Sequence, residues 1–490
     1  MLLLLSACTV QNIYPTTTII YDVGSPDTET VPGDNTDTGD ENLDAGAPNT
    51  TVDNGNLAVD VFGTDGNEYW LSVGSDQLAD ANLNWQNSWA YGGYYYSIGD
   101  SDTYANDLVV VDVTSGDAAS FGKVQFSVVG QSTGATWDAN SIPDISVDTD
   151  EYQDDLTVNG VEHLRFNNGQ VSSIFRESIA LEVFRNWGYP APRTSFAWLS
   201  SNVWGEGVHV PYTVVERYRD QWCTDHADQL GGGCANAWEG WGDFSKNYGW
   251  GYSIAEQCEG KTCGNTRMDE FVDLLDVTPM GDGFEAATAD YLDWPMIQEH
   301  MCADWILWIG DDPFHNSNNL YVVQGLDDKF RFLPYSTDIS GGQTWYQNTS
   351  LYPGTSQIAM GCAYDAACWE ETINTCQVMI DEFQAMQPAN IVTNTYERLA
   401  AQGMLRDGDD ATYAELLDWY TTRSTEGTLE SELDTYREAW TVGGCADTGM
   451  VVMGGGGFDT GNPCAIVDTG IGNDTAAPPA DDTATADTGA

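Results

Sequence analysis

The stretch DWILWIGDDPFHNSNNLYVVQGLDDKFRFLPYSTDIS, residues 304–340, decides how the rest of the chain is interpreted. Its second half contains two strand-like runs, 319–325 and 329–335, separated by a short turn. An antiparallel hairpin of these runs brings Asn319 beside the residues at the end of the second run. Asp312 lies on the loop that leads into the first strand. The hairpin therefore gathers polar side chains at its open end.

These polar residues suit phosphoryl transfer. The carboxylate of Asp312 would orient the attacking hydroxyl, whereas the amide of Asn319 and the carboxylate of Asp338 would hold Mg²⁺ against the phosphates. Acidic residues are so frequent in this sequence that their number carries little weight. The prediction at this point rests on spacing alone.

Around this stretch, the patterning is that of an α+β protein with strands first and helices later. Between residues 58 and 168, short β-branched or aromatic runs are bounded by Gly, Asp and Ser. Segment 171–187 has apolar residues at helical spacing, and two further strands follow it. Residues 223–265 are rich in Gly, Trp and Cys, and we expect them to be irregular. From about 370 to 440 the patterning is helical.

The charge of the chain excludes several classes of function. The sequence has 490 residues with 16 Lys and Arg against 76 Asp and Glu, a formal net charge of −60. We expect no nucleic-acid partner, because a duplex binder needs a basic surface, and no polybasic attachment to a membrane. A hydrophobic content of 41% with 18 Trp excludes a disordered polyanion. The acidic body indicates either a secreted protein of a saline or cation-rich setting or a lineage-wide bias.

One part of the chain departs from this acidity. Between Arg165 and Arg219, six Arg stand against four Glu, a local net charge of +2 (six minus four). An anionic ligand such as a nucleotide would find its best local field here. The alternative is that these six Arg are paired with nearby carboxylates.

The N-terminal segment predicts a lipid anchor. Leu5-Ser6-Ala7-Cys8 has the pattern of a bacterial lipobox, in which Cys8 is lipidated and becomes the mature N-terminus. The apolar run is too short to span a bilayer and lacks a basic n-region. Either the true start lies upstream or the resemblance is accidental, and we favour the lipoprotein. Residues 1–8 would be the signal, 9–57 a disordered acidic tether, and 446–490 an acidic tail. This predicts a protein anchored in a membrane through Cys8, at the surface or in the periplasm of a bacterium.

The cysteines predict disulfides rather than zinc. Eleven Cys are present, so ten remain if Cys8 takes a lipid, and an even number fits about five disulfides in an oxidising compartment. Local loops could join Cys223 to Cys234, Cys258 to Cys263 and Cys362 to Cys368, although spacing does not settle connectivity. No CxxC or HExxH occurs. The candidates are Cys223, Cys234, Cys258, Cys263, Cys302, Cys362, Cys368, Cys376, Cys445 and Cys464.

Four blocks of the sequence carry a family resemblance. They are LRFNNGQVSSIFRESIALEVFRNWGYPAPRTSFAWL, GVHVPYTVVERY, GDDPFHNSNNLYVV and FRFLPYSTDIS, which begin at residues 164, 207, 310 and 330. In this order they resemble successive blocks of the spore-coat protein H (CotH) kinase family, over roughly residues 105–345. The resemblance implies an atypical protein-kinase-like fold within a body of residues 58–445, with a β-rich N-terminal part and a helical C-terminal part. It also implies transfer of phosphate from ATP to Ser or Thr of secreted or surface proteins, with Mg²⁺ or Mn²⁺ (or Ca²⁺).

By position, the resemblance also implies roles for single residues. Asp312 matches the catalytic Asp of the family and Asn319 its metal-binding Asn. Arg165 matches the Arg of an LRxNN segment. Arg176 matches an R-E helix and Glu216 a strand that ends in Glu, and both would shape the nucleotide pocket.

Two departures from the family pattern keep a second function open. The "PWDxD" block reads PYSTD, so Ser336 stands in place of the principal Mg²⁺ ligand and only Asp338 remains, although a hydroxyl can also ligate Mg²⁺. Residues 128–144 contain no basic residue, where the family has Arg and Lys. The alternative is therefore a catalytically inactive, kinase-like binding or structural lipoprotein of the cell surface. A third alternative is another enzyme or a divalent-cation binder that uses the same acidic cleft.

Overall fold

The structure is a computed structural model with strands first and helices later, so the α+β class is confirmed. Cys8, the tether up to residue 45, the acidic tail and Cys258, Cys263, Cys445 and Cys464 lie outside the described residues. Within the described part, no helix is both long and apolar enough to cross a membrane. The described residues are 46–90, 103–130, 136–169, 173–240, 244, 254–257, 266–315, 319–342, 351 and 356–443.

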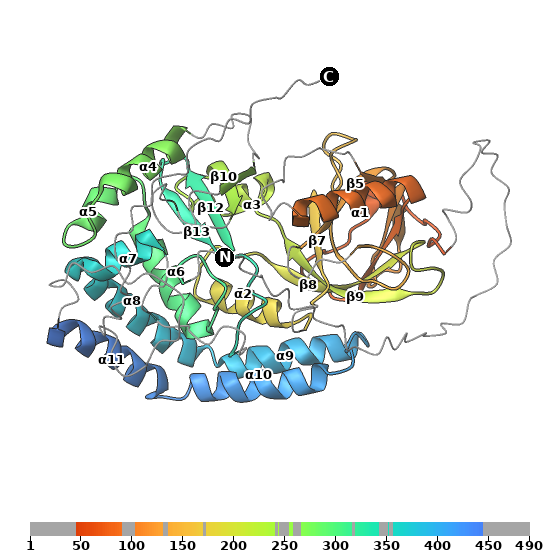
Figure 1. Ribbon diagram of the computed structural model, residues 1–490. Helices are drawn as coiled ribbons and strands as arrows, with labels where there is room; N and C mark the ends of the chain where they lie inside the picture. Colours follow the sequence, from red (N-terminus) through yellow and green to blue (C-terminus); the bar gives the residue numbers. More distant parts are fainter. Residues whose placement is uncertain are drawn as a thin grey trace, which may run out of the picture.

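The N-terminal part is built on one large sheet. Its order is β2-β5-β6-β7-β9-β8-β1-β3-β4, and the printed pairs are antiparallel except for β1 with β8. The helix α1 (Ser75–Ala90) lies against β5 (Figure 1). The strands are β1 (Asn67–Ser72), β2 (Tyr104–Ala105), β3 (Asp107–Val111), β4 (Ala118–Ser120), β5 (Val124–Val129), β6 (Asp144–Asp148), β7 (His163–Asn167), β8 (Thr194–Ser201) and β9 (His209–Glu216).

The predicted hairpin is confirmed, and it belongs to a second, smaller sheet. The strand β12 (Leu320–Gly325) pairs antiparallel with β13 (Phe330–Leu333), and Tyr321 lies opposite Leu333. The order of this sheet is β11-β10-β12-β13. The expectation of an irregular segment at 223–265 is wrong for its two strands, β10 (Cys234–Gly240) and β11 (Ile254–Gln257). Pairing of β10 with β12, which is distant in sequence, makes it a strand even though it lies in a stretch rich in Gly and polar residues.

Helices surround the smaller sheet and extend beneath the larger one. The helix α6 is buried along almost its whole length, polar residues such as His300 and Asp304 included, and it has Pro295 in its first turn. The predicted helical stretch corresponds to α8 through α11 (Figure 1). The helices are α2 (Arg176–Asn186), α3 (Asp220–Asp225), α4 (Thr266–Val277), α5 (Phe284–Thr288), α6 (Trp294–Leu307), α7 (Gln357–Tyr364), α8 (Ala366–Ala385), α9 (Pro388–Ala401), α10 (Asp409–Arg423) and α11 (Thr428–Gly443).

The helix α2 joins the two parts of the molecule. It precedes β8 in sequence, yet its apolar residues, such as Ile179 and Phe184, belong to the hydrophobic core of the helical part. It contacts both β8 and α9. The helix α9 is in turn tied to the larger sheet by Arg398, whose Nε lies 2.6 Å from Asp65 Oδ2 just before β1. The first turn of α2 therefore lies where the sheet and the helical part meet.

Three disulfides lie in the described part of the chain, in line with the expectation of disulfides from the even cysteine number. Two are the predicted local loops, Cys223–Cys234 and Cys362–Cys368. The third, Cys302–Cys376, joins α6 to α8 across 74 residues. Spacing did not indicate this pair, because its two cysteines meet only through the packing of two helices.

Candidate functional site

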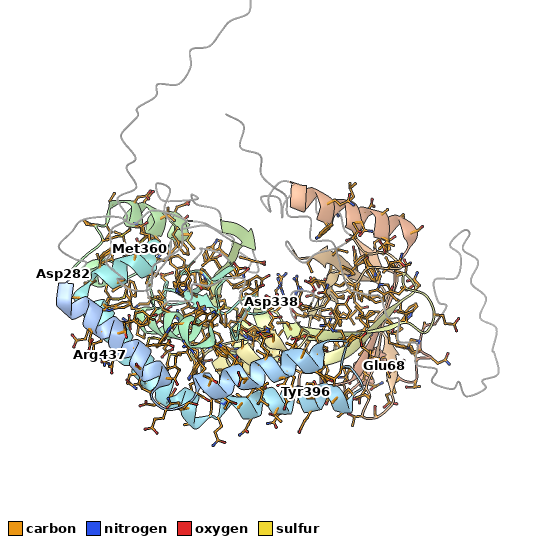
Figure 2. All side chains as sticks on the ribbon, turned by 60° about the horizontal axis from the view of Figure 1, so that its bottom comes forward. Glu68, Asp282, Asp338, Met360, Tyr396 and Arg437 are labelled. Carbon is orange, nitrogen blue, oxygen red and sulfur yellow. A yellow bond between two sulfur atoms is a disulfide. The ribbon has the colours of Figure 1, made fainter. Side chains whose placement is uncertain are left out.

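A pocket lies between the larger sheet and the hairpin of the smaller one. Its walls come from β7, from the first turns of α2, from the segment that leaves β9 and from the segment that leaves β13. Figure 2 places Asp338, just beyond β13, in the same region between the two parts. The lining residues include Arg165, Asn167, Glu177, Glu216, Arg217 and Ser336.

The sheet presents a polar face to this pocket because buried apolar and polar side chains alternate along β6 and β7. Ile145 lies opposite Phe166 in the antiparallel register, and both are buried in the core of the larger sheet. The next pair, Ser146 with Arg165, points to the other face. Asp144, two positions before Ser146, shares this face, and its Oδ2 is 3.9 Å from the Arg165 guanidinium. The alternation thus delivers one carboxylate and one guanidinium to the pocket side.

Four carboxyl groups lie near one another beside this pocket, and of these Glu177 lines it. Asp144, Glu177 and Asp311 are buried, and Asp338 is partly buried. Burial raises the pKa of Asp338 to about 6, and the charges of Asp144 and Asp311 raise it further. Burial also raises the pKa of Glu177 to about 8, with the charges of Asp338 and Asp144 adding to the effect. These groups therefore repel one another, which a cation among them would relieve.

The open end of the hairpin is held in a specific backbone conformation. Asn319 enters β12 with φ of 46°, and Ser336 leaves β13 with φ of 53°. The left-handed region is costly for most residues, although Asn tolerates it. The Asn319 amide nitrogen donates to the backbone oxygen of Asp311 at 2.8 Å and to its Oδ2 at 3.1 Å. The Ser336 hydroxyl donates to Asp338 Oδ1 at 3.1 Å. The structure thus links Asn319, Asp311, Ser336 and Asp338 around one end of the hairpin, as the sequence predicts for three of them.

Asp312 is more enclosed than the sequence suggests. Its side chain is 1% exposed. Its Oδ1 accepts from the backbone N–H groups of Phe314 and His315, at 2.6 and 2.8 Å. Its Oδ2 lies 2.7 Å from His315 Nδ1. The carboxylate therefore caps the loop before β12, and its second oxygen is held by His315.

Arg176 and Glu216 occupy positions that differ from that of Arg165. The Arg176 guanidinium donates to the backbone oxygen of Ser340 at 2.6 Å and lies 3.4 Å from Glu415. It therefore fixes the segment after Asp338 against α10. Glu216 lies opposite Leu164, on the face of the sheet away from Arg165, and its carboxylate accepts from Arg193 Nε at 3.0 Å.

Arg165 is thus the one of these three that joins the carboxyl cluster directly, whereas Glu216 only borders the pocket. The basic window is largely paired, as the alternative for its Arg residues predicts. Besides the pairs of Arg165, Arg176 and Arg193, Arg217 lies 3.8 Å from Glu239. Several partners lie outside the window, so its local excess of positive charge does not persist in the folded chain.

Sequence reasoning did not single out four groups of this site. Glu177 follows Arg176 directly in the R-E pair, so the motif contained it, but only Arg176 was predicted to shape the pocket. Asp311 precedes Asp312 in the same loop. Asp144 and His315 carried no signal of their own among so many acids and scattered His. Their proximity to the pocket depends on strand register and on a turn.

The donor set of this cluster fits a hard divalent cation. Carboxylate, amide and hydroxyl oxygens are the ligands that Mg²⁺ and Mn²⁺ take from proteins. The observation of this structure that supports such an ion is that Asp144, Glu177 and Asp311 are buried near Asp338, the Asn319 amide and the Ser336 hydroxyl. Fold and site together define an α+β protein with an acidic, cation-compatible cleft between a sheet and a helical part.

Comparison with known families agrees with this description. The model of the CotH kinase protein family matches residues 145–415, which is more than half of the chain. The chain therefore belongs to the CotH kinase family. The match begins later than the resemblance suggested and continues into α10. A search of the curated proteins finds no match.

Proposed function

We propose that this protein is an active CotH-like protein kinase that transfers the terminal phosphate of ATP to Ser or Thr of secreted or surface proteins. The kinase-like character of its fold is part of this proposal. The observation that supports it most is the carboxyl cluster of Asp144, Glu177, Asp311 and Asp338, which lies beside a pocket lined by Glu177 and Arg165. A phosphotransferase needs such a place, where a divalent cation and a nucleotide phosphate neutralise one another.

In the proposed site, Asp338, Asn319 and Ser336 would hold the divalent cation together with Asp311. The Asn319 amide nitrogen already donates to Asp311, so its oxygen is the donor atom that faces a cation. The Ser336 hydroxyl contacts Asp338 and can ligate the cation beside it. In this way it would replace the Asp that is missing from the family pattern. Mg²⁺ or Mn²⁺ would supply charge neutralisation to the transferred phosphoryl group.

Arg165 would take the place of the basic residue that is missing from 128–144. Its guanidinium lies in the pocket beside Asp144 and always carries charge, so it can bind a phosphate through bidentate hydrogen bonds. Glu216 borders the same pocket and, with Arg193, would shape the part that receives the rest of the nucleotide. Arg176 would act indirectly, through the segment after Asp338 that it anchors.

Asp312 would orient the acceptor hydroxyl and take its proton at Oδ2. His315 shares that oxygen, so it is a positioning residue for Asp312. Because Asp312 is buried, the acceptor has to approach from the side of His315.

The proposal includes a location. We infer a lipid anchor at Cys8 and a position at the surface or in the periplasm of a bacterium. The predicted tether cannot extend to residue 57, because Thr51 already donates to the Ala118 backbone oxygen and Leu57 is buried in the core of the larger sheet. The lipobox pattern supports the anchor, and the three disulfides fit an oxidising compartment. Mass spectrometry of the mature N-terminus tests it, and an unmodified Cys8 thiol would refute it.

A transfer assay tests the activity. Purified protein is incubated with labelled ATP, Mg²⁺ or Mn²⁺ and a generic acceptor protein, beside Asp338→Asn and Asp312→Asn. The matched control is Asp418→Asn, which removes one carboxylate from the exposed face of α10. We expect label transfer in wild type and in the Asp418 variant only. If wild type transfers no label and nucleotide does not raise its melting temperature, the inactive binding protein becomes the better description.

A further inference from the structure

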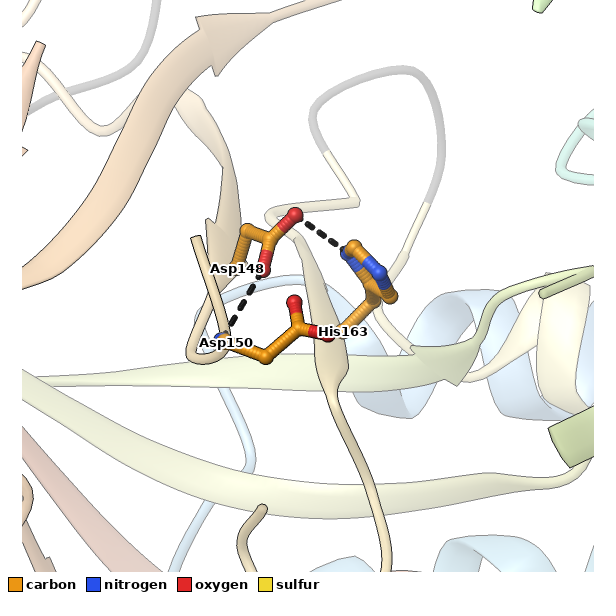
Figure 3. A group of neighbouring side chains, drawn as sticks. All are labelled: Asp148, Asp150 and His163. Atoms are coloured by element: carbon orange, nitrogen blue, oxygen red, sulfur yellow. Dashed lines mark hydrogen bonds and ion pairs between the residues drawn. The ribbon is translucent and has the colours of Figure 1, made fainter. Parts of the chain in front are cut away.

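A second group of potential ligands lies at the far end of the strands that form the site. Asp148 ends β6, Asp150 follows in the turn and His163 begins β7 (Figure 3). One donor atom from each lies within 4.8 Å of the other two. This group shares no residue with the carboxyl cluster of the pocket.

The sheet fixes the geometry of this group. Asp148 and His163 are direct partners in the antiparallel register, so their side chains leave the same face side by side. His163 Nδ1 is 3.1 Å from Asp148 Oδ2. The Asp150 N–H donates to Asp148 Oδ1, also at 3.1 Å, which holds the turn against the strand (Figure 3). Two of the three side chains thus stand on paired strands rather than on loops.

The spacing matches that of ligands around one ion. Ligand bonds of about 2.1 Å place neighbouring donor atoms about 3.0 Å apart in an octahedral site and about 3.4 Å apart in a tetrahedral one. The separation of 3.1 Å between His163 and Asp148 falls in this range. An ion can therefore replace the hydrogen bond between them with little movement of the backbone.

We propose that Asp148, Asp150 and His163 bind one divalent transition-metal ion of the Mn²⁺ to Zn²⁺ series. One imidazole and two carboxylates are a ligand set that such ions accept, with water in the remaining positions. Mg²⁺ and Ca²⁺ prefer oxygen ligands alone. The site is separate from the one in the pocket, because Asp148 lies four residues beyond Asp144, about 13 Å along the strand.

Two Arg next to the group weaken the binding of any cation, and they weaken it most for an ion that is held by charge alone. Arg217 and Arg219 line a small pocket together with His163, so their charges offset those of the two carboxylates. A hard ion that is held by charge alone gains little binding free energy in such surroundings. An ion that also bonds to the imidazole nitrogen gains binding free energy from that bond. Burial, with the charges of Arg219 and Arg217, also lowers the pKa of His163 to about 2. Burial likewise raises the pKa of Asp148 to about 8, so an ion bound here would displace the proton of that carboxyl.

Calorimetric titration of the full chain with Zn²⁺ tests the proposal. Excess Mg²⁺ and high salt are present throughout, so that oxygen-only sites and the acidic surface are occupied or screened. We expect one Zn²⁺ per chain, with the affinity lowered at least about tenfold in His163→Ala and in Asp150→Asn. The matched control is His209→Ala, since His209 is an exposed imidazole on β9 that contacts Ser200. A second control, Asp338→Asn, should keep the Zn²⁺ site.

The outcomes separate clearly. Equal isotherms for the His163 and His209 variants would refute the site, and so would loss of Zn²⁺ binding in Asp338→Asn. Circular dichroism shows whether each variant folds. If His163→Ala is misfolded, Asp150→Asn decides, because this nearly isosteric change leaves the backbone N–H that donates to Asp148.

Discussion

Replacing Asp338 by Asn should make the metal-free protein more stable while it abolishes activity. In the folded protein, burial and the charges of Asp144 and Asp311 raise the pKa of Asp338 from 3.8 to about 6. The unfolded chain therefore gives up this proton at lower pH than the native state does. Native stability is unaffected below about pH 4, falls as the pH rises through 4 to 6, and stays reduced above that. Asn carries no charge and avoids this loss.

The size of the effect follows from the shift. About two pKa units at 1.36 kcal/mol each correspond to at most about 3 kcal/mol, and to about 2 kcal/mol if the partly buried carboxyl keeps some water. The Ser336 hydroxyl can still donate to the amide oxygen, so this contact survives the change. The unfolding entropy of a folded body of about 400 residues is about 0.8 kcal/mol per degree. Dividing the gain in stability by this entropy gives an expected rise in melting temperature of about 3–4 °C.

Thermal melts of wild type and Asp338→Asn at pH 4 and pH 8, without divalent ions, measure the gap between their melting temperatures. We expect nearly equal melting temperatures at pH 4 and the full gap at pH 8. Mg²⁺ should raise the melting temperature of the wild type more than that of the variant and so narrow the gap. Asp418→Asn, an exposed change on α10, should show no pH-dependent gap. A variant that is less stable than wild type at pH 8, or a gap that does not grow with pH, would refute the reasoning about the carboxyl cluster.

Three further outcomes are expected. Asp312→Asn keeps the acceptor for the two backbone N–H groups of its loop, so transfer should fall by about 10²–10⁴-fold with little change in the nucleotide-induced thermal shift; parallel loss of both would point to misfolding. Arg165→Met should weaken nucleotide binding by about tenfold or more, and Arg165→Lys should weaken it less, as titration with a fluorescent nucleotide would measure; equal affinities in all three proteins would remove Arg165 from the site. Replacing Cys302 and Cys376 by Ser opens a loop of 74 residues and should destabilise the protein by about 4 kcal/mol in denaturant unfolding, an effect absent if the bond does not form.

Local signals were sufficient for part of this structure. The alternation and the turn of the hairpin predict β12 and β13 because both depend on neighbouring residues. Asn319, Ser336 and Asp338 lie at the ends of these two strands, so their convergence follows once the hairpin is known. Asp312 was placed on the correct loop, but its burial against His315 was not predicted, because it depends on a turn that the sequence does not mark.

Other groups needed the whole fold. Glu177 is on a helix and Asp338 is beyond a hairpin far along the chain, and only the packing of α2 between the two parts brings them together. The strand β10 and the Cys302–Cys376 pair depend on partners equally distant in sequence. Glu216 borders the pocket as predicted, but its contact with Arg193 was not, because it depends on the register of β9 with β7.

The sequence by itself determined the α+β class, the hairpin, the acidic character and the order of family blocks, because these depend on composition and short-range periodicity. The tertiary structure decided which charges meet. Four of the six Arg residues between 165 and 219 take carboxylate partners, three of which lie outside that window, so much of the local positive charge of the sequence is offset. The carboxyl groups that converge on Asp338 come from separate elements. Electrostatic energy depends on distance in space and on burial, and neither can be read from separation along the chain.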